Sequence, residues 1–158
     1  MRRRMSATPV TRLVESDWRE FATLRLRALA DTLGTRDPQY RQETAFTAAQ
    51  WRRRLRAHAQ FAVRVDGHLV GLIGAQRQTP ESVYLYSLWL ERGMRGKGLG
   101  RVLVSTAVDW ARSQDARIVT LRVAVSNAAA RGVYEQLGFG VTQTSTRAGE
   151  VTMSLSVG

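Results

Sequence analysis

Hydrophobic residues in the first third of the chain recur at spacings that predict two amphipathic helices. Apolar side chains lie three or four positions apart over residues 17–31, and Ser16 supplies a good N-cap for this helix. The pattern just before it, residues 11–16, predicts a short strand. A second helix is predicted over residues 47–58. Between the two helices, residues 34–46 are mostly polar and predict an irregular connection.

The middle of the chain changes to patterns that are typical of strands. Residues 61–78 alternate around Asp66-Gly67, a dipeptide that favours the two-residue turn of a β-hairpin. Residues 82–91 are rich in aromatic and branched side chains, which predicts the next strand. The nearly continuous apolar run RIVTLRVAV, residues 117–125, predicts a strand that is covered on both faces of the sheet.

Helices and strands alternate again towards the C-terminus. Apolar spacing predicts a helix over residues 99–114 and a shorter one over 127–137, which Gly138 ends. The segments FGVTQTS and EVTMSLSV predict a final hairpin. This order predicts one α/β domain over residues 1–158, with a mixed sheet of about seven strands, about four helices and a flexible basic tail at residues 1–9.

The charge of the chain is strongly positive, which changes the choice of partners. There are 24 lysines and arginines against 13 aspartates and glutamates, a formal net charge of +11, and all 24 but Lys97 are arginines. Such an excess favours nucleic acids or phosphorylated cofactors as partners. No apolar run is long enough to span a membrane, no secretory signal is recognisable, and cysteine is absent. We therefore expect a cytoplasmic protein without membrane association.

Four glycines fall within RGMRGKGLGR, residues 92–101, between a predicted strand and a predicted helix. The stretch fits neither of two phosphate-binding patterns, because Lys97 is followed by glycine rather than Ser or Thr and the G-x-G-x-x-G spacing is missing. The remaining pattern, R-x-x-G-x-G, places glycines at a helix N-terminus, where free backbone N–H groups attract anions. The sequence therefore predicts an anion site, with a simple connection as the alternative.

Two segments resemble one enzyme family. LWLERGMRGKGLGRVLVSTAVDWA closely resembles the acetyl-CoA motif of the GNAT superfamily of N-acetyltransferases. LRVAVSNAAARGVYEQLGF, residues 121–139, is similar to the second half of the family signature, N-x-x-A-x-x-x-Y-x-x-x-G-F. The resemblance implies a mostly antiparallel central sheet whose strands splay apart at the cofactor site. It also implies an enzyme that transfers an acetyl group from acetyl-CoA to a primary amine by direct attack in a ternary complex.

The resemblance further implies which residues bind acetyl-CoA as a cosubstrate. Amides of the glycine loop would bind its pyrophosphate, and backbone groups of the preceding strand would pair with its pantetheine arm as an added strand would. Asn127 would hydrogen-bond the same arm and orient the second helix. The implied cofactor-binding residues are Leu88, Trp89, Leu90, Arg95, Gly96, Lys97, Gly98, Leu99, Gly100, Arg101, Asn127 and Tyr134.

The candidate catalytic residues are Tyr134, Glu81 and Tyr84. The resemblance implies that Tyr134 protonates the departing thiolate, and a packed core aromatic is the alternative. Where some family members carry a glutamate, this chain has Tyr84, so we expect Glu81 or Tyr84 to act as the base through ordered water. A solvated turn carboxylate is the alternative for Glu81. The two histidines have no partner at ligand spacing, so no metal site is expected.

The acceptor is expected to be a small-molecule or peptide amine. The resemblance places it between the first two helices with their linker and the C-terminal hairpin. The candidate lining residues are Tyr40, Glu43, Phe46, Trp51, Tyr84, Tyr86 and Trp89. A non-catalytic protein that binds CoA thioesters is one alternative. A basic nucleic-acid-binding protein is another, although no nucleic-acid-binding motif is recognisable. A homodimer also stays open.

Overall fold

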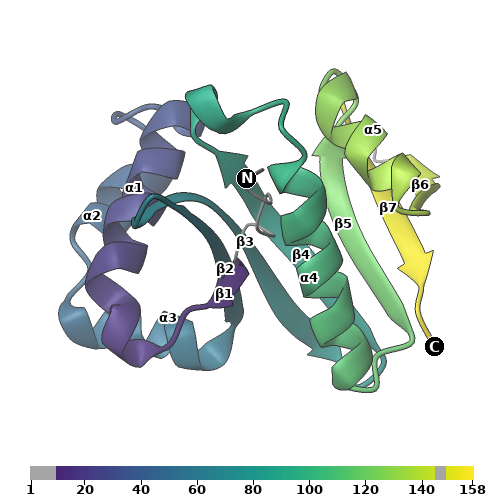
Figure 1. Ribbon diagram of the computed structural model, residues 1–158, viewed down its shortest axis with the longest axis horizontal. Helices are drawn as coiled ribbons and strands as arrows, with labels where there is room; N and C mark the ends of the chain where they lie inside the picture. The colour runs from purple at the N-terminus through teal and green to yellow at the C-terminus, as the bar shows by residue number, and fades with distance from the viewer. Residues whose placement is uncertain (1–9, 145–148) are drawn as a thin grey trace, which may run out of the picture.

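A twisted sheet runs through the molecule, and the helices pack against it (Figure 1). The computed structural model describes residues 10–144 and 149–158, and the predicted tail at 1–9 lies outside them. Within this part, seven strands pair in the order β1-β2-β3-β4-β5-β7-β6, and all neighbours are antiparallel except β4 and β5. The strands are β1 (Val10–Arg12), β2 (Ala59–Val65), β3 (His68–Thr79), β4 (Ser82–Leu90), β5 (Ile118–Ala124), β6 (Gly140–Thr144) and β7 (Glu150–Ser156).

Helices cover the two faces of the sheet unequally. The α-helices in the described residues are α1 (Trp18–Leu33), α2 (Pro38–Thr44), α3 (Ala48–Ala57), α4 (Leu99–Ser113) and α5 (Ala128–Gln136), and short 3-10 turns are η1 (Glu15–Asp17) and η2 (Arg92–Met94). Neighbours in β2 face different cores: Phe61 packs with residues of α4 and Ala62 with residues of α1 and α3. Figure 1 shows α4 lying across the middle of the sheet while α1 to α3 gather beside β1 to β3.

The alternating burial of β5 corrects one sequence expectation. Its residues were expected to be covered on both faces, but buried positions such as Val119 and Leu121 alternate with the half-exposed Thr120 and the exposed Arg122. The buried side chains pack with α4 and α5, whereas α1 to α3 do not reach this half of the sheet. The opposite face of β5 and β7 is therefore open, because α1 to α3 lie beside β1 to β3.

The predicted connection over residues 34–46 is also wrong, because it contains α2. The Asp37 side chain accepts a hydrogen bond from the Gln39 N–H at 2.8 Å, and Pro38 occupies the first helical position, where its missing N–H costs nothing. The predicted first strand is shorter than expected, since residues 15–17 form the turn η1. The hairpin prediction is confirmed: Asp66 and Gly67 both have positive φ, of 50° and 80°.

The parallel strands β4 and β5 pair over only three residues and then separate. The pairing runs from Ser82 with Ile118 to Tyr84 with Thr120. Beyond it, β4 bulges away from a regular ladder with β3, because Leu72 pairs with Trp89 and Gly74 with Tyr86. Two residues of β4 therefore face one residue of β3. This confirms the splayed strands that the family resemblance implied.

A buried ion pair fixes the bulge from the side of α1 and α2. The Arg25 guanidinium on α1 donates to both carboxylate oxygens of Glu43 on α2, at 3.0 and 3.1 Å, and to the Ser87 hydroxyl at 2.7 Å. Ser87 lies in the bulge and has a φ of 58°, which a residue with a side chain rarely adopts. The Glu43 side chain is only 4% exposed. Arg25 therefore joins two helices to the strained point of β4.

The ionisation of Glu43 depends on this contact. Burial opposes the charged carboxylate, but the hydrogen bonds and charge of Arg25 outweigh it and hold the pKa of Glu43 below its usual value of 4.5. A carboxyl whose pKa is lowered by folding stabilises the folded state above its unfolded pKa. That stabilisation is lost as the pH falls through the lowered pKa.

We predict that Glu43→Gln lowers the free energy of unfolding by about 3 kcal/mol, because it leaves the Arg25 charge buried without a counter-charge. Urea denaturation at neutral pH measures this, and the difference from wild type should shrink as the pH falls below about 4.5. The matched control is Glu15→Gln, whose exposed pair with Arg56 should contribute less than about 1 kcal/mol. Equal losses in the two variants would contradict the prediction.

Candidate active site

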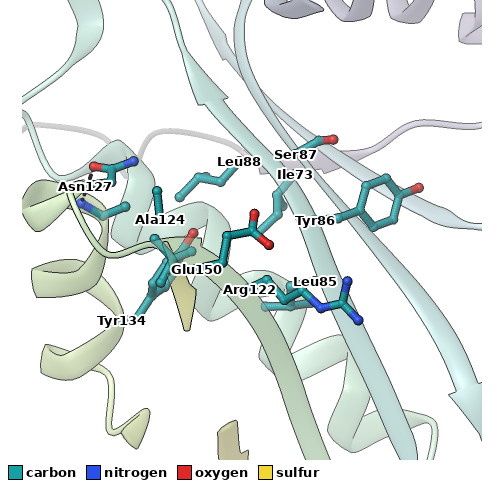
Figure 2. Close-up of a pocket in the computed structure, with 12 residues that line it drawn as sticks. Ile73, Leu85, Tyr86, Ser87, Leu88, Arg122, Ala124, Asn127, Tyr134 and Glu150 are labelled. Carbon is teal, nitrogen blue, oxygen red and sulfur yellow. Dashed lines mark hydrogen bonds between the residues drawn. The ribbon is translucent and has the colours of Figure 1, made fainter. Parts of the chain in front are cut away.

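A cavity of about 200 Å³ occupies the space where β4 and β5 separate. It is bounded by the bulged half of β4, the end of β5, the first residue of β7 and the helix α5 (Figure 2). Its lining residues are Ile73, Leu85, Tyr86, Ser87, Leu88, Arg122, Val123, Ala124, Asn127, Ala130, Tyr134 and Glu150. Three residues that were predicted from the sequence as cofactor-binding or catalytic therefore line the same cavity: Leu88, Asn127 and Tyr134.

Tyr134 is the buried phenol of this cavity. Its side chain comes from α5, is 6% exposed and packs at a tilt against Phe139, with 5.9 Å between the ring centroids. Among the described residues, no group hydrogen-bonds its hydroxyl, which projects into the cavity in Figure 2. Burial raises the pKa of Tyr134 to about 12, and the negative charge that Tyr84 gains when it ionises adds to this. The phenol is thus held in its protonated form, ready to act as a donor.

Asn127 begins α5 and also faces the cavity. Its side-chain oxygen accepts a hydrogen bond from the Ala130 N–H at 3.1 Å, as the dashed line in Figure 2 shows. This is an N-cap contact, which fixes the start of the helix that carries Tyr134. The side-chain oxygen is used for capping, so the amide NH₂ is the group left to face a ligand.

The glycine loop presents a row of uncommitted amides. The first hydrogen bond of α4 runs from the Val102 N–H to the Gly98 carbonyl oxygen at 3.2 Å. Within the part of the chain that the structure describes, the N–H groups of residues 96–101 donate to no protein acceptor. Gly96 and Gly98 have φ values of 76° and 83°, and no atom lies within 4 Å of where a Cβ would be. The turn is therefore open, and its amides add to the positive end of the α4 dipole.

Arg95, by contrast, is already committed to shaping the loop. Its guanidinium donates to the Leu90 carbonyl oxygen and to Asp31, both at 2.9 Å, and its own N–H donates to Arg92. The indole of Trp89 donates to the same Asp31 carboxylate at 2.8 Å. These bonds from Trp89 and Arg95 lower the pKa of Asp31. The exposed Lys97 and Arg101 are left to face an anion at this loop.

Leu88, Trp89 and Leu90, the three predicted residues of β4, lie along the part of its edge that does not pair with β5. Leu88 lines the cavity, while Trp89 and Leu90 pair on their other side with Leu72 and Gly71 of β3. Because the pairing with β5 ends at Tyr84, the facing edge of β4 is free of a neighbouring strand over this stretch. An extended chain could add to such an edge through backbone hydrogen bonds.

The two candidate bases are placed very differently. Glu81 lies in the turn between β3 and β4, its side chain is 71% exposed, and its nearest cation is Arg117 at 4.0 Å. The structure does not bring it to the cavity. Tyr84 lies at the last pair before the strands separate, stacked beside Tyr86 with 6.2 Å between ring centroids. Burial raises the pKa of Tyr84, against the opposing charge of Arg122.

Three polar lining residues were missed by the reasoning from sequence: Ser87, Arg122 and Glu150. Ser87 carries no local signal, because its conformation is imposed by the distant Arg25. The other two do carry one. In EVTMSLS and in RIVTLRVAV, polar residues alternate with apolar ones, which is typical of strands with one open face.

Of the residues expected to line an acceptor site, two are structural. Trp51 is 3% exposed and packs edge-on against Phe21 and Phe46 in the core under α1 and α3. Glu43 is bound to Arg25. Tyr86 does line the cavity, and its hydroxyl is held by Gln60 at 2.7 Å and by the His58 ring at 2.5 Å.

Residues 15–139 match the model of the acetyltransferase (GNAT) family, and the chain therefore belongs to this family. The streptothricin acetyltransferase of Streptomyces lavendulae is 36% identical over 88 residues, which cover 49% of this chain and 42% of that protein. The chain spans about half or less of the length of the first curated relatives it matches. Within the described residues, no helix has the length and apolar character of a membrane span.

Solved structures agree with the fold. A GNAT-family acetyltransferase from Streptococcus pneumoniae superimposes with a TM-score of 0.77 at 18% identity, covering 96% of this chain and 100% of the other. The PaiA N-acetyltransferase of Thermoplasma acidophilum, solved in complex with coenzyme A, superimposes with a TM-score of 0.75 at 16% identity, over 96% and 99% of the two chains. At these identities, the likeness concerns the fold of the two proteins.

We predict that the Tyr134 phenol is the last of the chain's tyrosines to ionise, with a pKa of about 12, because burial disfavours its phenolate. The measurement is the ultraviolet absorbance of phenolate as a function of pH in wild type and in Tyr134→Phe. The difference between the two titrations should appear only above about pH 11. A difference centred near pH 10 would show a solvated phenol instead.

Proposed function

We propose that this chain is an acetyl-CoA-dependent N-acetyltransferase. The observation that carries the proposal is the alignment of three features along one gap in the sheet. Open amides lie at the N-terminus of α4, the unpaired edge of β4 follows, and the buried phenol of Tyr134 lies beside the same gap. Acetyl-CoA has a diphosphate, an extended amide-containing arm and a thioester in the same order. Each part thus meets a group of matching chemistry.

The loop would hold the diphosphate through its backbone. The residues that fit this role are those whose N–H groups have no protein acceptor in the described part of the chain: Gly96, Lys97, Gly98, Leu99, Gly100 and Arg101. The open space at Gly96 and Gly98 lets a phosphate approach the main chain closely. Arg95 supports the site indirectly, because its bonds to Leu90 and Asp31 hold the loop against β4 and α1.

The edge of β4 would receive the pantetheine arm as a parallel strand would be received. When bound, acetyl-CoA supplies the thioester carbonyl that is the electrophile of the reaction. Leu88 is both in the cavity and in the bulge, so backbone groups at this point face the cavity rather than a neighbouring strand. An amide there would donate to the carbonyl oxygen as negative charge develops on it. One such donor contributes about 3 kcal/mol in comparable acyl transfers.

Tyr134 would supply the proton that the sulfur needs as it leaves. A thiol has a pKa of about 8.5, far below the pKa of about 12 of this phenol, so proton transfer is uphill to the free thiolate. It becomes favourable as the phenolate that forms recovers a proton from the attacking amine. Asn127 would keep α5 in place and direct its amide NH₂ to the arm.

The acceptor is proposed to be a primary amine, either a small molecule or a peptide. The open face of β5 and β7, beside the cavity, leaves room for it to reach the thioester. The names of the relatives include small-molecule and protein acceptors, so they do not choose between these two classes.

Thermal unfolding with and without acetyl-CoA tests the proposal. With micromolar affinity, millimolar acetyl-CoA should stabilise the fold by about 4 kcal/mol. Gly98→Glu should abolish this shift, because it forces a side chain with a negative charge into a positive-φ position where a phosphate belongs. Gly93→Glu is the matched control, since Gly93 has no positive φ and lies outside the row of open amides.

A thermal shift followed by thiol release from acetyl-CoA with a panel of primary amines completes the test. The panel contains a polyamine, an aminoglycoside, an aromatic amine and a short peptide with a free N-terminus. A shift without thiol release for any amine would favour a non-catalytic CoA-binding protein. The absence of any shift would overturn the proposal.

A further inference from the structure

Glu150 is a carboxylate that the proposed mechanism has not yet used. It is the first residue of β7, pairs with Ala124 of β5 and is half-buried. Figure 2 shows its side chain projecting into the cavity from the side of β7, between the phenol of Tyr134 and the strand β4. The carboxylate and the phenol therefore reach the same space from two different elements.

Glu150 also differs from the other glutamates of the chain. Each of the other six lies within 4.0 Å of an arginine nitrogen, as the pairs Glu15–Arg56, Glu20–Arg64, Glu43–Arg25, Glu81–Arg117, Glu91–Arg27 and Glu135–Arg131 show. Among the described residues, Glu150 has no such partner and accepts no hydrogen bond. A half-buried carboxylate that pairs with no arginine of the described residues is suited to bind a cationic ligand.

The surroundings of Glu150 suit an ammonium group. Tyr86 lines the same cavity, and its ring, with Tyr84 stacked beside it, offers a π surface to a cation. Arg122 lies in the same cavity but turns towards the Tyr84 ring, 6.0 Å from its centroid, rather than forming an ion pair with Glu150. The negative charge of Glu150 raises the pKa of Tyr84, so the two groups are close enough to interact.

We propose that Glu150 binds the ammonium group of the acceptor and accepts its proton, so that the preferred acceptors are cationic primary amines. This inference rests on the acetyltransferase function proposed above. The ammonium would donate a charge-assisted hydrogen bond to the carboxylate and leave one proton on it. The amine nitrogen then forms the new N–C bond while the C–S bond breaks. Tyr134 gives its proton to the sulfur and recovers one from the nitrogen, and Glu150 releases its proton to solvent.

Other candidate bases in the described residues are less well placed. Glu81 is exposed at the far end of β4, and Glu43 is enclosed by Arg25. Burial lowers the pKa of His58, which would suit a base, but its Nδ1 is bonded to the Tyr86 hydroxyl and the ring does not line the cavity. Glu150 is the carboxylate that shares the cavity with Tyr134.

The test is the pH dependence of kcat/KM for Glu150→Gln, measured with the best amine of the panel. At neutral pH the variant should lose about 10²-fold in kcat/KM for the amine, because an ammonium can no longer be bound and deprotonated. The loss should shrink as the pH approaches the pKa of that amine, which is about 10 for an alkylamine and about 8 for a peptide N-terminus, because the solvent then supplies free amine. Glu150→Asp should retain part of the activity, since it keeps the carboxylate.

The titratable and charged groups near Glu150 should add no step to this pH dependence of kcat/KM. Tyr84 and Tyr86 of β4 and Tyr134 of α5 have raised pKa values, so all three keep their protons between about pH 6 and 9. Arg122 of β5 is the other charged group that lines this cavity. The matched control is Glu135→Gln on α5, an exposed carboxylate outside the cavity, which should leave the profile unchanged.

The outcomes separate the two proposals. Glu150→Gln should keep the stabilisation by acetyl-CoA, because the glycine loop is untouched. A variant with wild-type kcat/KM at neutral pH, in an enzyme that binds acetyl-CoA and acetylates amines, would overturn the role of Glu150 alone. A loss that falls on Glu81→Gln instead would do the same and restore the sequence hypothesis. Failure of the wild type to bind acetyl-CoA or to release thiol would overturn both.

Discussion

The separation of β4 from β5 after Tyr84 and Thr120 is the constraint on which the rest of the site depends. A sheet that continued its regular pairing would leave neither a cavity nor a free strand edge. The separation is stabilised at a distance, since Arg25 ties the bulge at Ser87 to α1 and α2. A buried charge pair is a weak source of stability but a strong constraint on geometry, because neither partner can move without leaving the other unpaired.

Segments that are far apart in the sequence contribute residues to the space between β4 and β5. α1 contributes Arg25 to the bulge and Asp31 to the glycine loop, so one helix holds both the bulge and the C-terminal end of β4. α5 supplies Tyr134, and the cap at Asn127 fixes where that helix begins. β7 supplies Glu150 from the open face. Positive charge in the loop and negative charge in the cavity are thus kept apart, which suits a ligand with an anionic end and a partner that arrives as a cation.

Local patterns were sufficient to predict the parts of the structure that local forces decide. Asp66-Gly67 specifies its turn through backbone preference alone, and the glycine loop was recognisable from spacing. α2 was missed although Asp37-Pro38 is a helix start, because the segment lacks an apolar stripe to mark it. Ser87 could not be found from sequence, since its conformation comes from a residue 62 positions away. Glu150 could have been found, because the alternation along β7 marks one face as polar.

Amide hydrogen exchange with and without acetyl-CoA tests the central claim most directly, because it observes the backbone groups themselves. Residues 96–101 should exchange rapidly in the free protein, as their N–H groups have no protein acceptor in the described residues. Acetyl-CoA should slow exchange there and along residues 85–90 together, while the hairpin turn at 66–67 stays unchanged. Loop amides that are already protected in the free protein, or that show no change with saturating acetyl-CoA, would contradict the account.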